Sequence, residues 1–287
     1  QDVGGQDLED RRRMMPIADC RRKVRDEFPF PLYVDNSLSG VVDTIASTVR
    51  RYLKPGARIL DFGSGPCDKT AIIQCLGYEC SAFDDLLDDW HRSDDNLQRI
   101  IAFTKRMNID FKLAEDGYLP FPKRSYDMVM SHDVLEHLHD SPRDLLNDLC
   151  ELLKPNGLLF ITVPNAVNIR KRIDVLRGNT NLPAFETYYW YPGRWRGHVR
   201  EYVREDLRLL AQYLGLEILE LDSCHNMLHV VPHKIRPIYL MLTKIFPGWR
   251  DSWLLVARKP EEWISRKTLP KEEFNKIMGR VSPFYRS

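Results

Sequence analysis

Short apolar runs alternate with amphipathic segments along most of the chain. Between residues 38 and 53, apolar residues recur at helical spacing, with Ser37 as a candidate N-cap and Pro55-Gly56 after the last turn. ARILDF at 57–62 is a short apolar run before glycines, which predicts a buried strand. The same criteria predict strands at 78–84, 109–114, 125–132, 158–164, 216–223 and 253–259, and helices at 67–77, 95–106, 141–153 and 203–214.

Strands separated by helical segments of about 10–15 residues indicate βαβ units. The chain therefore predicts an α/β fold with a mostly parallel sheet and helices on both faces. Two segments interrupt the alternation, 165–200 and 225–251, and we expect both to cover a substrate, because ligands bind beyond the carboxyl ends of such strands. We expect an N-terminal extension at 1–36, irregular or partly helical, a domain at 37–259 and a peripheral tail at 260–287.

The composition sets few limits on function. Lys and Arg number 42 against 41 Asp and Glu, and the net charge of +1 gives no general attraction to nucleic acid or anionic membranes. The six cysteines are scattered without a CxxC pair, which favours free thiols over disulfides or a zinc site. Residues 1–15 lack the apolar core of a signal peptide, and 235–246 is too short to span a bilayer. We expect a soluble, cytoplasmic protein.

The stretch ILDFGSGP at 59–66 places two glycines after a buried strand. A dinucleotide site needs a third glycine, where this chain has Asp68, and a P-loop needs a G-K-[ST] that is missing. The two glycines still allow close approach of a ligand, and Asp61 suits a cationic or hydroxyl-rich group better than a phosphate. A glycine turn with a purely structural role is the alternative.

Further acids follow the next strands. Asp84 and Asp85 end the second strand, about 20 residues beyond the loop, where a carboxylate can accept hydrogen bonds from ribose hydroxyls. Glu115 and Asp116 follow the third strand, where one acid could bind the exocyclic amine of adenine. These positions favour an adenosine-containing ligand.

In this order and spacing, the motifs resemble those of the class I S-adenosylmethionine-dependent methyltransferases, in particular the type 11/12 small-molecule group. The resemblance is strong over residues 55–165 and weaker over 197–218 and the last strand. The matching stretches are ILDFGSGP, GYECSAFDD, AEDGYLPFP, SYDMVMSHDVLEHL and LKPNGLLFITVPN.

The resemblance implies a Rossmann-like sheet of seven strands, whose last strand, 253–259, is antiparallel, and S-adenosylmethionine as the cofactor. Asp61 would lie near the ammonium group of its methionine part, Asp84 would bind the ribose, and Glu115 or Asp116 would bind the adenine. Backbone around His132 would lie beside the methyl group. The candidate cofactor-binding residues are Asp61, Gly63, Ser64, Gly65, Asp84, Asp85, Glu115, Asp116 and His132.

A methyltransferase mainly has to align the acceptor and exclude water, because the sulfonium of its cofactor is already electrophilic. A hydroxyl acceptor is helped by a general base, and the candidates are His198, His137 and Asp133. A lid or hinge histidine bonded to its neighbours is the alternative for His198, and a structural or cofactor-side role is the favoured alternative for His137. His132, His137 and His139 do not share one helical face, so we expect no metal site.

The acceptor is less well indicated. The chain lacks the [NDS]-P-P-[YFW] segment and the Pro-Cys pair of nucleic-acid methyltransferases, so we expect no nucleic-acid partner. Residues 165–200 mix arginines with aromatic residues, which suits sugars, phosphorylated or aromatic small molecules, and also single-stranded nucleic acid. Aromatic side chains that pack onto the core, with solvated arginines, are the alternative. For 229–250 we expect a helix buried against the sheet, with contact to a membrane surface or a lipid-linked substrate as the alternative.

The sequence thus predicts methyl transfer from S-adenosylmethionine to oxygen or nitrogen of a small molecule, with a saccharide or secondary metabolite favoured. An NAD-dependent oxidoreductase is a second hypothesis, which Asp68 disfavours. A non-catalytic binding module is a third, which the intact acids and glycines disfavour. The oligomeric state is not predicted.

Overall fold

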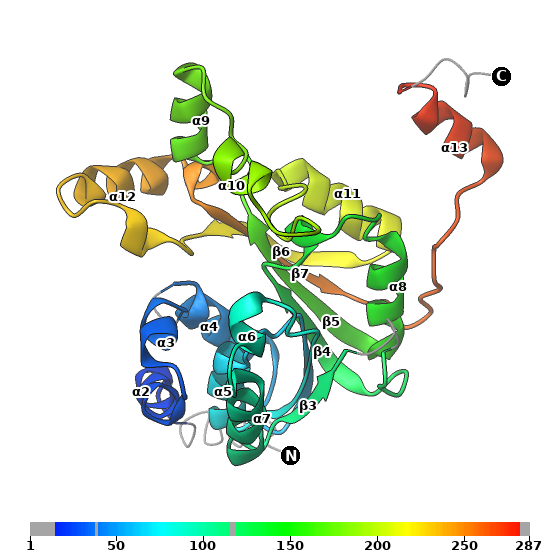
Figure 1. Cartoon of the computed structure of the whole chain (residues 1–287). Coiled ribbons are helices and arrows are strands. Elements are labelled where there is room, and N and C mark those ends of the chain that lie inside the picture. Colours follow the sequence, from blue (N-terminus) through cyan, green and yellow to red (C-terminus); the bar gives the residue numbers. More distant parts are fainter. Residues whose placement is uncertain (1–14, 38–39, 115–118, 282–287) are drawn as a thin grey trace.

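The structure is a computed structural model that describes residues 15–37, 40–114 and 119–281 (Figure 1). Within these ranges the strands are β1 (Arg58–Phe62), β2 (Glu79–Asp84), β3 (Asp110–Leu113), β4 (Tyr126–His132), β5 (Leu153–Pro164), β6 (Glu217–Cys224) and β7 (Ser252–Arg258). They form one sheet in the order β3-β2-β1-β4-β5-β7-β6. β7 is antiparallel to β5 and β6, and the other neighbouring pairs are parallel. The predicted seven-stranded α/β fold is confirmed.

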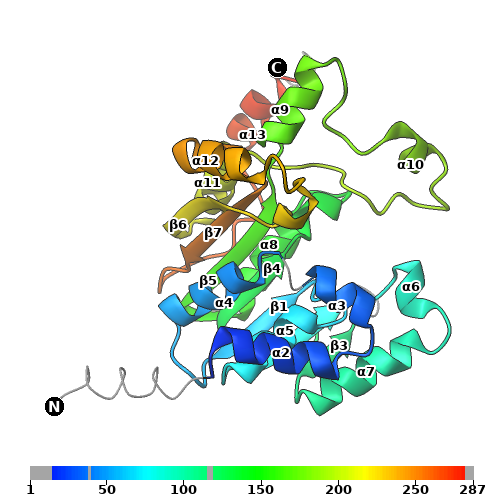
Figure 2. The same ribbon diagram turned by 90° about the vertical axis from the view of Figure 1, so that its left-hand side faces the viewer.

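Helices cover both faces of the sheet (Figures 1 and 2). In order they are α2 (Ile17–Glu27), α3 (Pro31–Ser37), α4 (Val42–Tyr52), α5 (Asp68–Cys75), α6 (Asp89–Arg92), α7 (Asn96–Arg106), η1 (Leu135–His137), α8 (Arg143–Leu152), α9 (Ile169–Leu176), α10 (Phe185–Tyr189), α11 (Arg204–Leu214), η2 (Leu228–Val230), α12 (Arg236–Ile245), η3 (Pro247–Trp249) and α13 (Lys271–Met278). Alternate strand residues point to opposite faces. Thus Ile59 packs in the core formed with α2, α4, α5 and α7, and Leu60 in the core formed with α8 and α11.

Two predicted element boundaries are wrong. Ser37 is the last residue of α3, and α4 begins only at Val42. The Ser37 hydroxyl donates a hydrogen bond to the carboxylate of Asp68, so it joins α3 to α5 instead of capping α4. β5 begins at Leu153 and not at residue 158, because Leu153 already pairs with Tyr126 before a shift of register.

The two insertions emerge beyond the carboxyl ends of β5 and β6 and carry α9, α10 and α12 (Figures 1 and 2). The prediction that α12 is buried against the sheet is wrong for most of its apolar side chains. Tyr239 and Thr243 are buried, whereas Ile238, Met241 and Ile245 are exposed. No helix among the described residues has the length and apolarity needed to cross a membrane.

Candidate active site

The glycine loop between β1 and α5 opens towards space that a ligand could fill. Gly63 has φ +72°, and a Cβ there would lie 2.2 Å from Cγ2 of Val134, so no larger residue fits. Gly65 has φ +54°, but a Cβ there would meet no atom within 4 Å. The loop therefore packs tightly on one side and leaves its backbone accessible on the other. Ser64 lies between them with its hydroxyl 3.3 Å from Sγ of Cys67.

Asp84 at the end of β2 is fixed against this loop. One carboxylate oxygen accepts a hydrogen bond from the N–H of Gly65 at 2.7 Å, and the other accepts one from the N–H of Leu86 at 2.8 Å. Burial raises the pKa of Asp84, while the two backbone donors stabilise its charged form. A carboxylate oxygen can accept more than one hydrogen bond, so Asp84 is placed to bind hydroxyl groups next to Gly65.

Asp61 lies in β1, one residue before the end of the strand. Its side chain is buried, and it accepts a hydrogen bond from the Thr70 hydroxyl at 2.6 Å. Burial raises its pKa to about 6. Lys69, which the sequence analysis missed, lies close by: burial favours its neutral form, but Asp133, Asp68 and Asp61 outweigh burial and raise its pKa. Lys69 therefore supplies a positive charge in the first turn of α5.

His132 is the last residue of β4. Its ring is buried, with Nδ1 3.1 Å from the Thr162 hydroxyl, and burial together with Lys69 lowers its pKa to about 3. His132 is therefore neutral at physiological pH, and its buried Nε2 has no hydrogen-bond partner among the described residues. Glu115 and Asp116, the adenine candidates, lie outside the described residues.

A cavity of about 320 Å³ lies between α3, α5, the residue that follows β4 and the second insertion. The Asn226 side-chain amide donates a hydrogen bond to Asp133 at 3.0 Å, and Lys69 lies 4.0 Å from the same carboxylate. The residues that line the cavity include Tyr33, Ser37, Lys69, Asp133, Asn226 and His229. The N-terminal helices thus take part in the wall of the site.

The end of the first insertion is bound to η1, directly after β4. The Glu136 carbonyl accepts hydrogen bonds from the N–H groups of Val199, at 2.6 Å, and Arg200, at 3.2 Å. These bonds bring the rings of His137 and His198 to a centroid separation of 5.0 Å. The structure therefore places two of the three candidate bases together.

His198 is oriented by an acid that the sequence analysis missed. Its Nδ1 lies 2.7 Å from the carboxylate of Glu201, which also pairs with Lys171. Burial lowers the pKa of His198 to about 4, and His137 and Lys171 act in the same direction. Glu201 favours the charged imidazolium, but Lys171 offsets its charge, so His198 is neutral near pH 7. The sequence held one indication of this pair, because Glu201 follows His198 by only three residues.

These residues fit S-adenosylmethionine better than a dinucleotide. Asp84 suits ribose hydroxyls, the Lys69 ammonium suits the carboxylate of an amino acid, and the open side of Gly65 admits a ligand close to the backbone. Asp68 occupies the position of the third glycine and is buried against Ser37. A buried acid at that point disfavours a pyrophosphate.

Comparison with known proteins agrees with this fit. Residues 37–221, well over half of the chain, match a family model described as a methyltransferase domain. An uncharacterized methyltransferase from Schizosaccharomyces pombe is 32% identical over 124 residues, which are 40% of this chain and 42% of that protein. A demethylmenaquinone methyltransferase from Corynebacterium efficiens is 28% identical over 109 residues, 38% of this chain and 42% of that protein. The chain thus matches about two fifths of the length of these relatives.

A solved structure shows the same fold. It is the 1,6-didemethyltoxoflavin-N1-methyltransferase from Burkholderia thailandensis with bound S-adenosylhomocysteine, with a TM-score of 0.50 and 17% identity. The similarity covers 85% of this chain and 87% of that one. By the family match over most of its α/β domain, the chain belongs to the methyltransferase-domain family, with S-adenosylmethionine as its cofactor.

Proposed function

We propose that the protein transfers a methyl group from S-adenosylmethionine to a hydroxyl oxygen of a small molecule. The observation that carries this proposal is the 2.7 Å contact between Nδ1 of His198 and the Glu201 carboxylate. A carboxylate that holds the imidazole leaves its other nitrogen to receive a proton. A hydroxyl acceptor needs such help and an amine does not, so this pair favours oxygen over nitrogen.

The cofactor residues have distinct tasks in this proposal. Gly63, Ser64 and Gly65 bring the backbone close to the methionine part, with Asp61 and Lys69 supplying charges of opposite sign near its amino-acid group. The ribose is bound by Asp84, with Asp85 beside it, and the adenine by Glu115 or Asp116. His132 lines the site beside the methyl group. The bound cofactor supplies an electrophilic methyl carbon, and the chain aligns the acceptor with it.

The acceptor side is polar near the sheet and apolar at its outer edge. Tyr33, Asn226 and His229 line the cavity, which suits a hydroxylated molecule such as a saccharide or another secondary metabolite. The exposed apolar side chains of α9, α10 and α12 lie further out, among them Leu176, Tyr189 and Met241. They support an acceptor with an apolar portion, such as a lipid-linked molecule presented at a membrane surface.

The other two hypotheses find less support. An NAD-dependent oxidoreductase would have to bind a pyrophosphate where Asp68 is buried. A non-catalytic binding module would have no use for an imidazole held by a carboxylate at the carboxyl end of β4.

The test compares His198→Asn with His233→Asn, a control at an exposed histidine outside the site. Release of S-adenosylhomocysteine is measured against grouped acceptors, first hydroxylated and then amines, and cofactor affinity is measured by calorimetry. We expect His198→Asn to lower kcat about 100-fold or more with a cofactor Kd close to that of the parent. A parent that does not bind S-adenosylmethionine, or a His198→Asn variant with normal turnover across pH, would contradict the proposal.

A further inference from the structure

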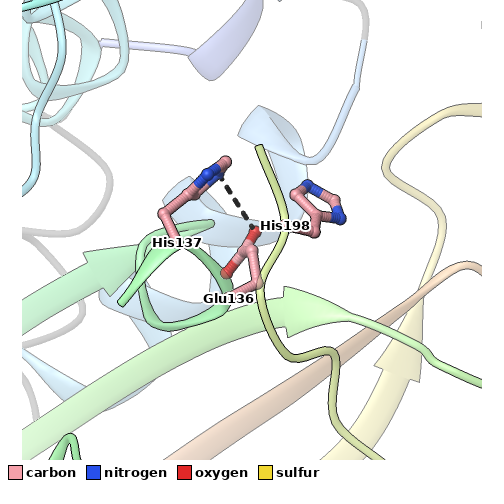
Figure 3. Close-up of side chains that lie close together, drawn as sticks. All are labelled: Glu136, His137 and His198. Atoms are coloured by element: carbon pink, nitrogen blue, oxygen red, sulfur yellow. Dashed lines mark ion pairs between the residues drawn. The ribbon is translucent and has the colours of Figure 1, made fainter. Parts of the chain in front are cut away.

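Three metal-ligating side chains meet where the first insertion is bound to η1. Glu136 and His137 belong to η1, and His198 reaches them from the end of the insertion (Figure 3). One possible ligand atom from each residue lies within 4.8 Å of the other two. Nε2 of His137 is 4.0 Å from a carboxylate oxygen of Glu136. This set differs from the three histidines considered in the sequence analysis, because Glu136 and His198 replace His132 and His139.

Among the described residues, the carboxylate of Glu136 has no hydrogen-bond donor. The side chain is fully buried, and neither oxygen makes a hydrogen bond within the described residues. Burial, together with the neighbouring Asp133, raises its pKa to about 9. Buried carboxylates are normally paired, hydrogen-bonded or bound to a metal, since an isolated one is costly. The backbone carbonyl of Glu136 accepts two hydrogen bonds, whereas its carboxylate accepts none among the described residues.

In both histidines the Nδ1 atom has a hydrogen-bond acceptor beside it, as in histidines that bind metals. Nδ1 of His137 lies 2.7 Å from the carbonyl of Arg196, and Nδ1 of His198 lies 2.7 Å from the Glu201 carboxylate. Both partners accept hydrogen bonds, so Nδ1 carries the proton in each ring and Nε2 keeps its lone pair. Histidines that bind metals in proteins usually donate their other N–H to a carbonyl or a carboxylate in this way. About a third of each side chain is exposed, which provides a route for an ion from solvent.

We propose that Glu136, His137 and His198 bind one divalent transition-metal ion, of which Zn²⁺ is the representative. Two imidazole nitrogens and one carboxylate oxygen suit this class better than Mg²⁺, which prefers oxygen ligands. Ligand atoms about 2.0–2.2 Å from an ion lie roughly 3–3.5 Å apart, so these side chains would draw together by about 1 Å. Three protein ligands leave a coordination position open.

In one respect this inference rests on the proposed function: the open position would take the acceptor hydroxyl. There the hydroxyl loses its proton to solvent more readily, its oxygen forms a bond to the methyl carbon, and the sulfur–methyl bond breaks. In the metal-bound protein the ion occupies the Nε2 lone pair of His198, so the ion replaces His198 as the group that promotes loss of the hydroxyl proton; the methyl donor, the hydroxyl acceptor and the requirement for His198 stay as proposed above. The acceptors of this class are molecules whose hydroxyl can bind a metal, such as a phenol or a sugar diol.

The test measures ion binding without cofactor or acceptor. The full chain is stripped with a chelator and titrated with Zn²⁺, Mg²⁺ and Co²⁺; calorimetry reports affinity, and the visible absorption of Co²⁺ reports its ligands. We expect one equivalent of Zn²⁺ to bind, Mg²⁺ to bind at least 100-fold more weakly, and Glu136→Gln and His198→Asn each to weaken Zn²⁺ binding at least 100-fold. Glu201→Gln should weaken it about 10-fold or more, and His233→Asn should leave it unchanged.

Failure of one equivalent of Zn²⁺ to bind the stripped parent would overturn the inference, as would equal affinity in the His198→Asn variant. His198→Asn decides the test if Glu136→Gln does not fold, because His198 is partly exposed. The two proposals fail separately. Tight Zn²⁺ binding without methyl transfer would contradict the proposed function alone, and methyl transfer by a chelated protein that binds no Zn²⁺ would contradict the metal site alone.

Discussion

The guanidinium of Arg196 lies 3.2 Å from the carboxylate of Asp85 and 3.1 Å from that of Asp88. Arg196 belongs to the first insertion, and the two acids follow β2, directly after the ribose candidate Asp84. The contact therefore joins the segment expected to cover the substrate to the loop expected to hold the cofactor. Since all three side chains are more than a third exposed, each ion pair contributes only a few tenths of a kcal/mol to about 1 kcal/mol.

Loss of this contact should loosen the cover without affecting the fold. We expect Arg196→Gln to raise the Kd for S-adenosylmethionine about two- to fivefold and to speed proteolysis within 177–194. The effect should shrink at high salt, because exposed charges are screened. Arg194→Gln is the matched control, with the same change of charge at an exposed position on the same segment. Equal Kd values for the two variants would show that the pair does not hold the cover over the cofactor.

Asp84 should be required for cofactor affinity. In Asp84→Ala the N–H of Gly65 and the ribose hydroxyls all lose their acceptor, so we expect binding to weaken by about 1–3 kcal/mol, roughly 5- to 150-fold in Kd. Calorimetry with S-adenosylmethionine measures this, and thermal unfolding of the free protein checks that it is folded. Asp89→Ala, at an exposed acid in α6, is the control. Parent-like affinity in Asp84→Ala would remove the ribose assignment.

How much of the site could be predicted depends on whether its parts are local in sequence. The glycine loop and Asp84 were found because each directly follows a strand, and parallel strands bring their carboxyl ends to one edge. The proximity of His198 to Glu136 was not predicted, because it depends on backbone hydrogen bonds between segments about 60 residues apart. The pattern of side chains along the sequence does not predict such backbone hydrogen bonds.

In the second insertion the sequence predicted the helix but not its burial. Its apolar residues repeat at helical spacing, which correctly predicts a helix within 229–250. The same spacing does not tell which faces of the helix are covered, and α12 buries only Tyr239 and Thr243. Lys69 was missed for a third reason: a lysine in the first turn of a helix is common, and only the carboxylates around it in the fold mark it as a charged group of the site.

The buried carboxyl of Asp61 should make stability depend on pH. Its pKa is raised from 3.8 in the unfolded chain to about 6 in the fold, so its favourable contribution is complete below pH 3.8 and is lost as the pH rises through 6. The difference corresponds to roughly 3 kcal/mol. Asp61→Asn keeps an acceptor for Thr70 and does not titrate. We therefore expect the free energy of unfolding of Asp61→Asn, relative to the parent, to rise by most of this amount between pH 4 and pH 7.

Urea unfolding of the cofactor-free protein at several pH values measures this difference, with Asp89→Asn as a control at an exposed acid. Parallel curves for Asp61→Asn and the parent would mean that Asp61 titrates normally in the fold. The same variant should bind S-adenosylmethionine more weakly if Asp61 lies near the ammonium group, as the resemblance implies.

The two glycines of the loop should respond differently to the same substitution. In both Gly63→Ala and Gly65→Ala a left-handed backbone costs about 1–2 kcal/mol. Only at Gly63 does the added methyl group also clash, at 2.2 Å from Cγ2 of Val134. We expect Gly63→Ala to lower the free energy of unfolding further than Gly65→Ala, and Val134→Ala to restore part of the loss.

Gly65→Ala should instead act on the ligand, because its methyl group would project into the space left open beside the loop. We expect this variant to remain folded, because its loss of stability is small. Its Kd for S-adenosylmethionine should nevertheless be at least tenfold higher than that of the parent. Chemical unfolding and calorimetry on the two variants and the parent separate the two effects. If Gly65→Ala binds the cofactor like the parent, the open side of the loop is not where the cofactor lies. If Gly63→Ala is no less stable than Gly65→Ala, Val134 does not limit the size of residue 63.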